Sequence, residues 1–228
     1  MRDHSAMCDL VELDEENLWT KPVNSSDKRP YGIPYWITKD PTTTAEGAFN
    51  GGNPAGFSSG AAGVDSTLYP RWKNWTFGYT QANRDDLVRK MKKAMTFTKF
   101  MAPVPHPTLG LGSADHVIYT TYRTLEPLQR LAEDRNDNHG NDVAKFMNEV
   151  VVNGVPIRLV YWLEANDSDD PVYGIDFSQF RPFVKTGVDM RRNPPKVAAR
   201  QHNVREVHID RAMNYNCYNR RSMFVGSK

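Results

Sequence analysis

The stretch QHNVREVHIDRAMNYNCYNRRSMFV, residues 201–225, decides the fold of this chain of 228 residues. It contains neither Pro nor Gly, and its apolar residues from position 207 onward share one parity: Val207, Ile209, Met213, Tyr215 and Cys217. A period of two is typical of a β-strand with one buried face. Arg211 interrupts the apolar parity, which predicts a bend or bulge at that position.

The length of this stretch is as informative as its pattern. Most strands have about 3–10 residues, so a strand of roughly 20 residues would be an outlier. At about 3.3 Å per residue it would extend for roughly 65 Å. A compact globule of this chain length has a diameter of about 45 Å. Either the strand is broken or the protein is not a compact globule. We favour an elongated molecule whose long ribbon lies against neighbouring copies.

The composition is that of a folded and rather polar protein, with 39% hydrophobic and 25% charged residues. The mean hydropathy of −0.64 suits a chain with long loops, or one that partners complete. A net charge of +2 does not indicate a dedicated nucleic-acid binder. The apolar runs are too short for a membrane span or a signal peptide. Cys8 and Cys217 form neither a metal-binding spacing nor a disulfide framework, which favours a reducing cytoplasm.

Residues 3–19 have the pattern of an amphipathic helix. The buried stripe is expected to contain Met7, Leu10, Val11, Asp14 and Leu18. The opposite face is acidic, with Asp9, Glu12, Glu15 and Glu16. We interpret this acidic run as a solvated surface.

Residues 83–100 predict a second helix, because Asn83 is a good N-cap and acidic residues at 85 and 86 favour the positive helix start. Its apolar stripe is Leu87, Met91, Ala94, Met95 and Thr98. Its basic residues could meet phosphate, but a solvated surface is the favoured interpretation: Arg84, Arg89, Lys90, Lys92 and Lys93. The prolines at 103, 105 and 107 then forbid a continued helix.

The remaining segments predict shorter elements. Residues 21–74 hold little regular structure apart from an extended edge segment at 31–38. A strand at 115–122, a helix at 125–133 capped by Thr124, a strand at 172–177 and a helical turn at 178–184 follow. Between them, Asn153-Gly154 suits the type I′ turn of a hairpin formed by residues 150–162. This order of elements predicts an α+β fold.

The segment GFSSG, residues 56–60, matches the G-x-S-x-G pattern of a hydrolase nucleophile elbow, with Ser58 as the nucleophile. That motif needs a strand before it and a helix after it. Here Gly-rich sequence lies on both sides, which favours a chance match in a loop. A serine hydrolase that uses Ser58 is retained as an alternative function.

Aromatic and basic residues alternate in YPRWKNWTFGY, residues 69–79. With the basic helix, Arg71, Trp72 and Trp75 could form a nucleic-acid-binding module in which the rings stack on bases. Such aromatic residues more often anchor a loop on a core, or a subunit on its neighbour. The module is kept as a third functional class.

The other candidate ligands do not converge on a site. The six histidines have no metal-binding spacing: His4, His106, His116, His139, His202 and His208. Asp167, Asp169 and Asp170 lack the Gly and terminal Glu of a calcium loop, so an Asx-rich turn is expected there. The sequence therefore predicts no catalytic residue, no cofactor-binding residue and no metal site, which favours a structural protein over an enzyme.

Several segments together carry a family resemblance. They are GGNPAGFSSGAAGVDSTLYPRWKNW (51–75), DDLVRKM (85–91), DHVIYTTYRTLEPLQRLAEDRND (115–137), VYGIDFSQFRPFVKTGVDMRRNPP (172–195) and RQHNVREVHIDRAMNYNCYNRRSMFV (200–225). In order and spacing, the chain resembles the major capsid proteins of tailed bacteriophages, which share the Hong Kong phage capsid fold. The resemblance covers nearly the whole chain and implies a structural protein without enzymatic activity.

The resemblance implies two domains, a P-domain with a spine helix and a long β-strand and a mixed α/β A-domain. Residues 1–69 would supply the spine helix and a long loop of the P-domain, residues 70–188 the A-domain, and residues 189–228 the returning P-domain strand. The N-terminal arm and E-loop that precede the spine helix in this family have no counterpart before residue 3. We therefore expect a truncated chain, and no crosslinking residue is assigned.

The resemblance also implies the partners. The chain would bind copies of itself in hexamers and pentamers, and would assemble in the host cytoplasm into a virion capsid. Packaged double-stranded DNA would be contacted without sequence specificity. Scaffolding, portal or decoration proteins are further expected partners, and a membrane is not.

Overall fold

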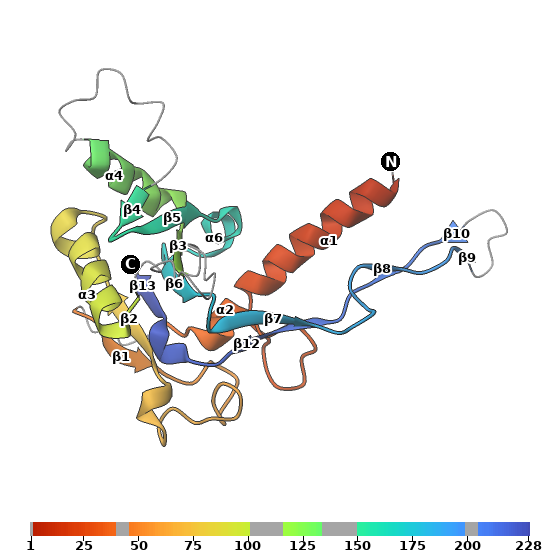
Figure 1. Cartoon of the computed structure of the whole chain (residues 1–228), viewed down its shortest axis with the longest axis horizontal. Helices are drawn as coiled ribbons and strands as arrows, with labels where there is room; N and C mark the ends of the chain where they lie inside the picture. The colour runs from red at the N-terminus through yellow and green to blue at the C-terminus, as the bar shows by residue number, and fades with distance from the viewer. Residues whose placement is uncertain (1, 40–45, 101–115, 134–149, 199–204) are drawn as a thin grey trace, which may run out of the picture.

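The computed structural model describes residues 2–39, 46–100, 116–133, 150–198 and 205–228. The molecule is elongated (Figure 1). A body built on a β-sheet forms one end, and helix α1 (Arg2–Trp19) and a two-stranded ribbon project from it on the same side. The elongated shape predicted from the C-terminal stretch is confirmed. No described helix is long and apolar enough to cross a membrane.

The body contains a mixed seven-stranded sheet in the order β1-β2-β13-β6-β3-β5-β4. Its strands are β1 (Ala48–Gly51), β2 (Asn74–Gly78), β3 (His116–Thr120), β4 (Val150–Val152), β5 (Val155–Leu159), β6 (Val172–Asp176) and β13 (Phe224–Ser227). Strand β13 comes from the end of the chain but pairs inside the sheet, parallel to β2 and antiparallel to β6. The sheet is therefore complete only when the C-terminal residues have paired.

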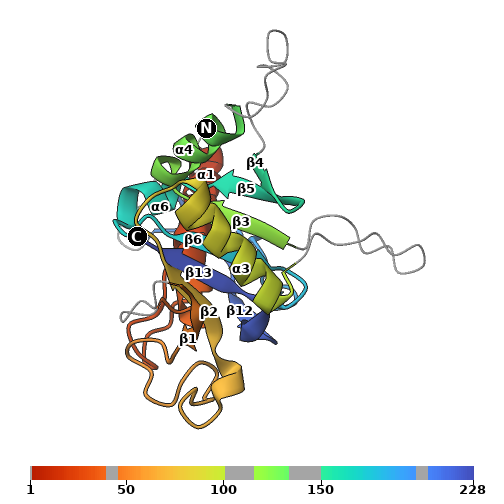
Figure 2. The same ribbon diagram turned by 90° about the vertical axis from the view of Figure 1, so that its left-hand side faces the viewer.

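Helices cover both faces of this sheet. They are α2 (Ile33–Trp36), α3 (Arg89–Thr98), α4 (Tyr122–Glu133) and α6 (Tyr161–Asn166), with the short 3₁₀ turns η1 (Pro70–Trp72) and η3 (Arg220–Ser222) and the π-helical turn η2 (Arg84–Val88). Figure 2 shows α3 in front of the sheet and α1 behind it. The two faces therefore have separate hydrophobic cores.

Strand β13 contributes to both cores because its side chains alternate. Phe224 packs in the core beneath α3 and α4, whereas Met223 and Val225 belong to the core that contains α2, α6 and the end of α1. Gly226 has no space for a side chain, since a Cβ there would lie 2.5 Å from the Phe77 ring. The two-sided burial explains why the last residues of the chain read as a continuous apolar run.

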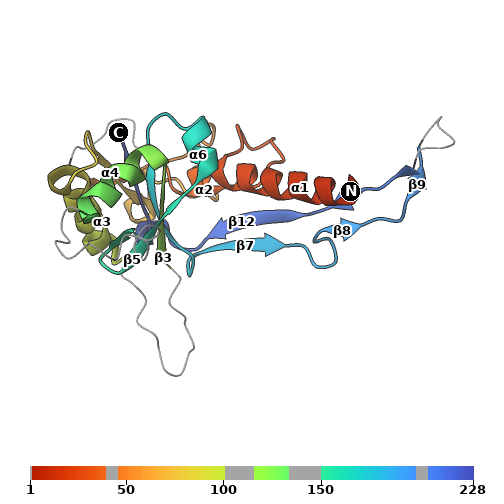
Figure 3. The same ribbon diagram turned by 90° about the horizontal axis from the view of Figure 1, so that it is seen from above.

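The ribbon consists of paired short strands. Strands β7 (Phe180–Val184), β8 (Arg191–Arg192) and β9 (Lys196–Val197) lead outward, and β10 (Arg205–Glu206), β11 (Ile209–Asp210) and β12 (Met213–Cys217) lead back. Each outward strand pairs antiparallel with a returning one (Figure 3). The prediction of one strand of roughly 20 residues is therefore wrong. The length of the ribbon comes instead from a hairpin whose two arms are each divided into short strands.

Residues 207–208 separate β10 from β11, and from β11 onward the first break occurs at Arg211, where a bend was predicted. The Arg211 side chain forms ion pairs with Asp14 of α1 and with Asp189 of the outward strand. The Ala212 N–H donates to the carbonyl oxygen of Val188, so the two chains stay bonded through the bend. The predicted interruption is confirmed, since Arg211 and Ala212 belong to no strand, and it coincides with the ion pair between Arg211 and α1.

The second break is the η3 turn between β12 and β13, which carries the buried Arg220. The Arg220 side chain is 0% exposed and donates hydrogen bonds to the carbonyl oxygens of Trp36 and Gly52 and to Oδ1 of Asn74. Its guanidinium also lies over the Trp72 ring, 5.9 Å from the centroid. Burial lowers the pKa of Arg220 to about 10. This residue joins the ribbon to the long loop and to β2.

Several local predictions agree with the structure. Residues 3–19 lie in α1 and residues 172–177 contain β6. Asn83 caps its helix by accepting a hydrogen bond from the Asp86 N–H at 2.7 Å. Asn153 and Gly154 have φ angles of 50° and 80°, as the hairpin between β4 and β5 requires.

Other local predictions are wrong. The segment 31–38 contains the short helix α2 rather than an extended edge, because Pro34 lies in a first helical turn, where it is tolerated. The helical turn predicted at 178–184 is not found, because Phe180–Val184 form strand β7, for which β12 supplies a pairing partner. Helix α4 begins at Tyr122, so Thr124 lies inside it and is not its cap. The prolines at 103, 105 and 107 lie outside the described residues.

Asp86 holds the start of the α3 region together. Its carboxylate accepts hydrogen bonds from the backbone N–H groups of Thr80 and Gln81, at 2.7 and 3.0 Å, and pairs with the buried Lys90 at 2.5 Å. Partial burial on its own would raise the pKa, but the bonds from Lys90 and from the two backbone groups outweigh it and lower the pKa of Asp86 to about 2. The ionised form is therefore the one that the fold stabilises.

Replacing Arg220 with Met is expected to lower the free energy of unfolding by about 3 kcal/mol or more, because several buried acceptors lose their donor at a cost of about 1–3 kcal/mol each. Arg221→Met is the matched control. Its guanidinium lies 3.6 Å from the Phe49 ring on an exposed surface, so a loss of about 0.5–1 kcal/mol is expected. Urea unfolding measures both, and equal losses would contradict the role of Arg220.

Replacing Asp86 with Asn is expected to lower the free energy of unfolding by about 1 kcal/mol at pH 7. The folded pKa of about 2 lies below the ordinary value of 3.8. The contribution of Asp86 is therefore complete above pH 4 and disappears as the pH falls toward 2. Thermal unfolding between pH 5 and 2 should show the two proteins converging. Asp85→Asn, which removes the same charge nearby, should change stability by only a few tenths of a kcal/mol.

Candidate functional site

Ser58 lies in a loop made of successive turns, not between a strand and a helix. Gly56 and Gly60 have φ angles of 91° and 81°, and a Cβ on either would lie 2.0 Å from a carbonyl oxygen, of Val23 or of Val64. The glycines of GFSSG are thus explained by turn geometry and close backbone contact. The strand and helix that a nucleophile elbow needs are not found at this motif.

Ser58 does line a hollow of about 570 Å³, together with aromatic side chains that include Tyr31, Phe57 and Phe183. The lining residues are Ser25, Tyr31, Tyr35, Trp36, Gly56, Phe57, Ser58, Ser59, Gly60, Ala62, Gly63, Phe183, Asn214, Tyr215 and Asn216. They include no His, Asp or Glu, so this described wall offers Ser58 no base. The serine-hydrolase alternative has no geometric support here.

The proposed nucleic-acid module is not assembled as a stacking surface. Trp75 is buried and stacks on Phe97 at 5.1 Å, and Trp72 donates from its ring nitrogen to the carbonyl oxygen of Ala61. Arg71 remains exposed. On the basic helix, several charges are already neutralised by carboxylates: Arg89 and Lys93 by Glu46, and Lys90 by Asp86. These aromatic rings act as core anchors, as the alternative interpretation held.

The two histidines whose side chains are described, and the aspartates of residues 167–170, lie close to charged or polar side chains. His116 Nε2 lies 3.8 Å from Asp176, and His208 Nε2 lies 3.8 Å from Glu206. Asp167 and Asp169 both pair with Lys39. Asp170 is buried and lies near Arg123, Thr121 and Lys228. His106, His139 and His202 and the side chain of His4 lie outside the described residues. No group of acids, Cys and His able to hold a metal occurs among the residues described.

The projecting helix and ribbon are the parts that the body covers least. Among residues 5–19 of α1, whose burial is described, only Trp19 is buried, and it packs edge-on against Tyr119 with ring centroids 5.5 Å apart. Val11 of α1 is 59% exposed and Phe183 of β7 is 49% exposed. Large apolar side chains on projecting elements of a soluble protein typically mark an interaction surface.

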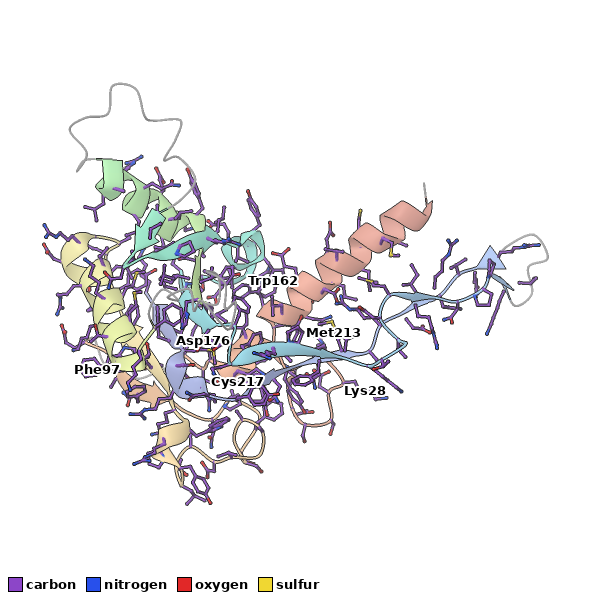
Figure 4. All side chains as sticks on the ribbon, viewed as in Figure 1. Lys28, Phe97, Trp162, Asp176, Met213 and Cys217 are labelled. Carbon is purple, nitrogen blue, oxygen red and sulfur yellow. The ribbon has the colours of Figure 1, made fainter. Side chains whose placement is uncertain are left out.

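A groove of about 640 Å³ separates α1 from the ribbon. Met213 and Lys28 lie along it (Figure 4). Its walls are Leu10, Leu13, Asp14 and Asn17 of α1, Lys28 and Pro30 of the loop, and Phe183, Val184, Lys185, Arg211, Ala212, Met213 and Asn214 of the ribbon. The sequence does not identify this surface, because FRPFV, residues 180–184, has no period of two and was expected to belong to a helical turn.

Cys8 and Cys217 are not joined by a disulfide and lie in different parts of the molecule. Cys8 is exposed on α1, and Cys217 is buried at the base of the ribbon. Burial raises the pKa of the Cys217 thiol to about 12, which suppresses its thiolate form.

A fluorophosphonate probe is expected to leave Ser58 unlabelled, because its described surroundings hold no general base. The measurement is mass spectrometry of the labelled and digested protein, with Ser58→Ala as the control. Labelling of the wild type at residue 58, lost in the variant, would restore the hydrolase alternative.

The comparison with known proteins finds a similar structure but no similar sequence. No family model matches the sequence, and no curated protein matches it. A chain of the capsid asymmetric unit of cyanophage A-1(L) has a similar structure, with a TM-score of 0.56 and 12% sequence identity over 98% of this chain and 68% of that chain. The expected α+β fold is confirmed in this coarser form. This chain has a phage capsid-like fold.

Proposed function

We propose that this chain is a structural subunit of a viral capsid, a major capsid or coat protein of a bacteriophage. The observation that carries the proposal is the likeness to a cyanophage capsid chain over 98% of this chain, in body and projections alike. The exposed apolar residues that line the groove between α1 and the ribbon support it, since grouped exposed apolar residues are typical of an interaction surface. In this proposal the protein has no enzymatic role.

The proposed assembly consists of hexamers and pentamers of identical chains. A subunit that contacts its neighbour through two different patches forms a ring when the rotation closes. The elongated shape of this molecule favours such contacts, because its projecting helix and ribbon reach beyond its own body (Figure 3). Further copies would then connect the rings into a shell.

We propose the same domain division, with the same boundaries, as was expected from the sequence. Residues 1–69 and 189–228 would form a P-domain around the spine helix α1, and residues 70–188 an A-domain. Strand β13 lies in the same sheet as β2 and β6, so in this proposal the returning segment ends by joining the A-domain sheet. The returning strands of the ribbon, β10 to β12, would be the long strand of the P-domain.

The remaining partners are proposals of the same kind. The shell would enclose double-stranded DNA and touch its phosphates without reading sequence. Scaffolding, portal or decoration proteins would join it during assembly in the host cytoplasm, and the mature location would be the virion.

Electron microscopy and light scattering after size-exclusion chromatography test the proposal. The chain is expressed alone and together with its upstream coding region, and rings or shells are expected in at least one preparation. A monomer that persists in both preparations, at every protein and salt concentration tried, would contradict the proposal.

A further inference from the structure

Most of helix α1 carries charge of one sign, which is negative. Between residues 5 and 19 the sequence has five acidic residues and no basic one. Asp14 pairs with Arg211 of the ribbon. The other four are exposed, and none forms an ion pair with another described residue: Asp9, Glu12, Glu15 and Glu16. The described residues therefore pair none of these four carboxylates with a cation.

These four carboxylates point away from the ribbon. The groove wall on α1 is formed by Leu10, Leu13, Asp14 and Asn17. At 3.6 residues per turn, Glu12 and Glu15 lie on the opposite side of the helix, and Asp9 and Glu16 lie on the flank between them and the groove wall. The acidic face, defined as these four residues, is therefore open to a second molecule.

The arrangement is unfavourable for an isolated helix. Glu12 and Glu16 are like charges four residues apart, which destabilises a helix. Glu15 and Glu16 lie near the negative end of the helix dipole, and no basic residue lies in the last turn. Because nothing in the described chain offsets these repulsions, an external cationic surface would stabilise α1.

The outer end of the ribbon, residues 191–198 and 205–210, supplies the opposite charge. It has four basic residues, Arg191, Arg192, Lys196 and Arg205, and two acidic ones, Glu206 and Asp210. Asp210 pairs with Arg191 and Glu206 lies near His208, whereas Lys196 and Arg205 form no ion pair with a described residue. Val197 beside them is 63% exposed.

We propose that the acidic face of α1 in one copy docks on the outer end of the ribbon of a second copy. Lys196 and Arg205 would meet the acidic face, and Val197 would pack against Val11. The two surfaces of one chain do not meet, because the outer end extends past the start of α1 (Figure 3) and the acidic face points away from the ribbon. The Arg211–Asp14 pair shows the same chemistry, a ribbon cation on an α1 carboxylate, inside one copy.

This inference rests on the proposed self-assembly and specifies which two surfaces form a contact between copies. Two charge-reversed variants of the full chain test it, Glu12→Lys with Glu16→Lys on the helix and Lys196→Glu with Arg205→Glu on the ribbon. A third variant combines all four changes. The control is Arg84→Glu with Lys92→Glu, which makes the same charge change as the ribbon variant, on exposed positions of the body. Circular dichroism verifies that each variant is folded.

Each two-residue reversal is expected to raise the protein concentration needed for assembly at least tenfold. The four-residue variant should return it to near the wild-type value, because both charges have been exchanged. The control should assemble like the wild type, and raised salt should weaken assembly of the wild type and the four-residue variant alike.

The results separate this inference from the proposed function. If the wild type assembles and the helix and ribbon reversals leave assembly unchanged, the docking contact is wrong although the capsid function stands. If the ribbon reversal abolishes assembly and the four-residue variant does not restore it, the ribbon cations serve another partner, such as DNA, and the contact is wrong. A wild type that never assembles overturns both.

Discussion

The burial of the Arg220 guanidinium between the body and the ribbon is the constraint on which the rest of the structure depends. Burying a charge costs free energy unless the charge is hydrogen-bonded, and here Nε and one terminal nitrogen donate to carbonyl and amide oxygens of Trp36, Gly52 and Asn74 rather than to a carboxylate. These acceptors come from segments far apart in the sequence. Gly51 allows the arrangement, since a Cβ there would lie 2.0 Å from the Asn74 side chain. The long loop, β2 and the ribbon base can therefore form only together.

From this junction the two projections leave in defined directions. Phe180 and Tyr215 stack at 5.5 Å across the first pair of ribbon strands, and Trp19 packs between Tyr119 and Tyr173 at the base of α1. Aromatic packing of this kind is rigid and buries a large area. The long loop that looked irregular in the sequence is ordered because it supplies the acceptors and aromatic contacts at this junction.

The sequence predicted the elements whose signals are local. Periodicity identified α1 and most of α3, and Asn153-Gly154 identified its hairpin. Periodicity failed where pairing with a distant segment decides the local structure, because β7 is a strand only beside β12. Arg220 could not be recognised as buried, since an arginine in a polar stretch reads as surface. Of the candidate site, the acidic run on α1 was visible as a charge pattern, but only the position of the groove shows which way it points.

The proposed contact between copies determines what kind of assembly can form. Two α1 helices cannot pair through their acidic faces, because carboxylates would then face carboxylates. Two basic ribbon ends repel for the same reason. A contact between unlike patches is left, and such heterologous contacts propagate until they close into a ring. Whether they close depends on the angle between the acidic face and the ribbon end within one copy. That angle is held by the rigid base of both projections, so the buried Arg220 and the aromatic packing beside it connect the fold of one chain to the curvature of the assembly.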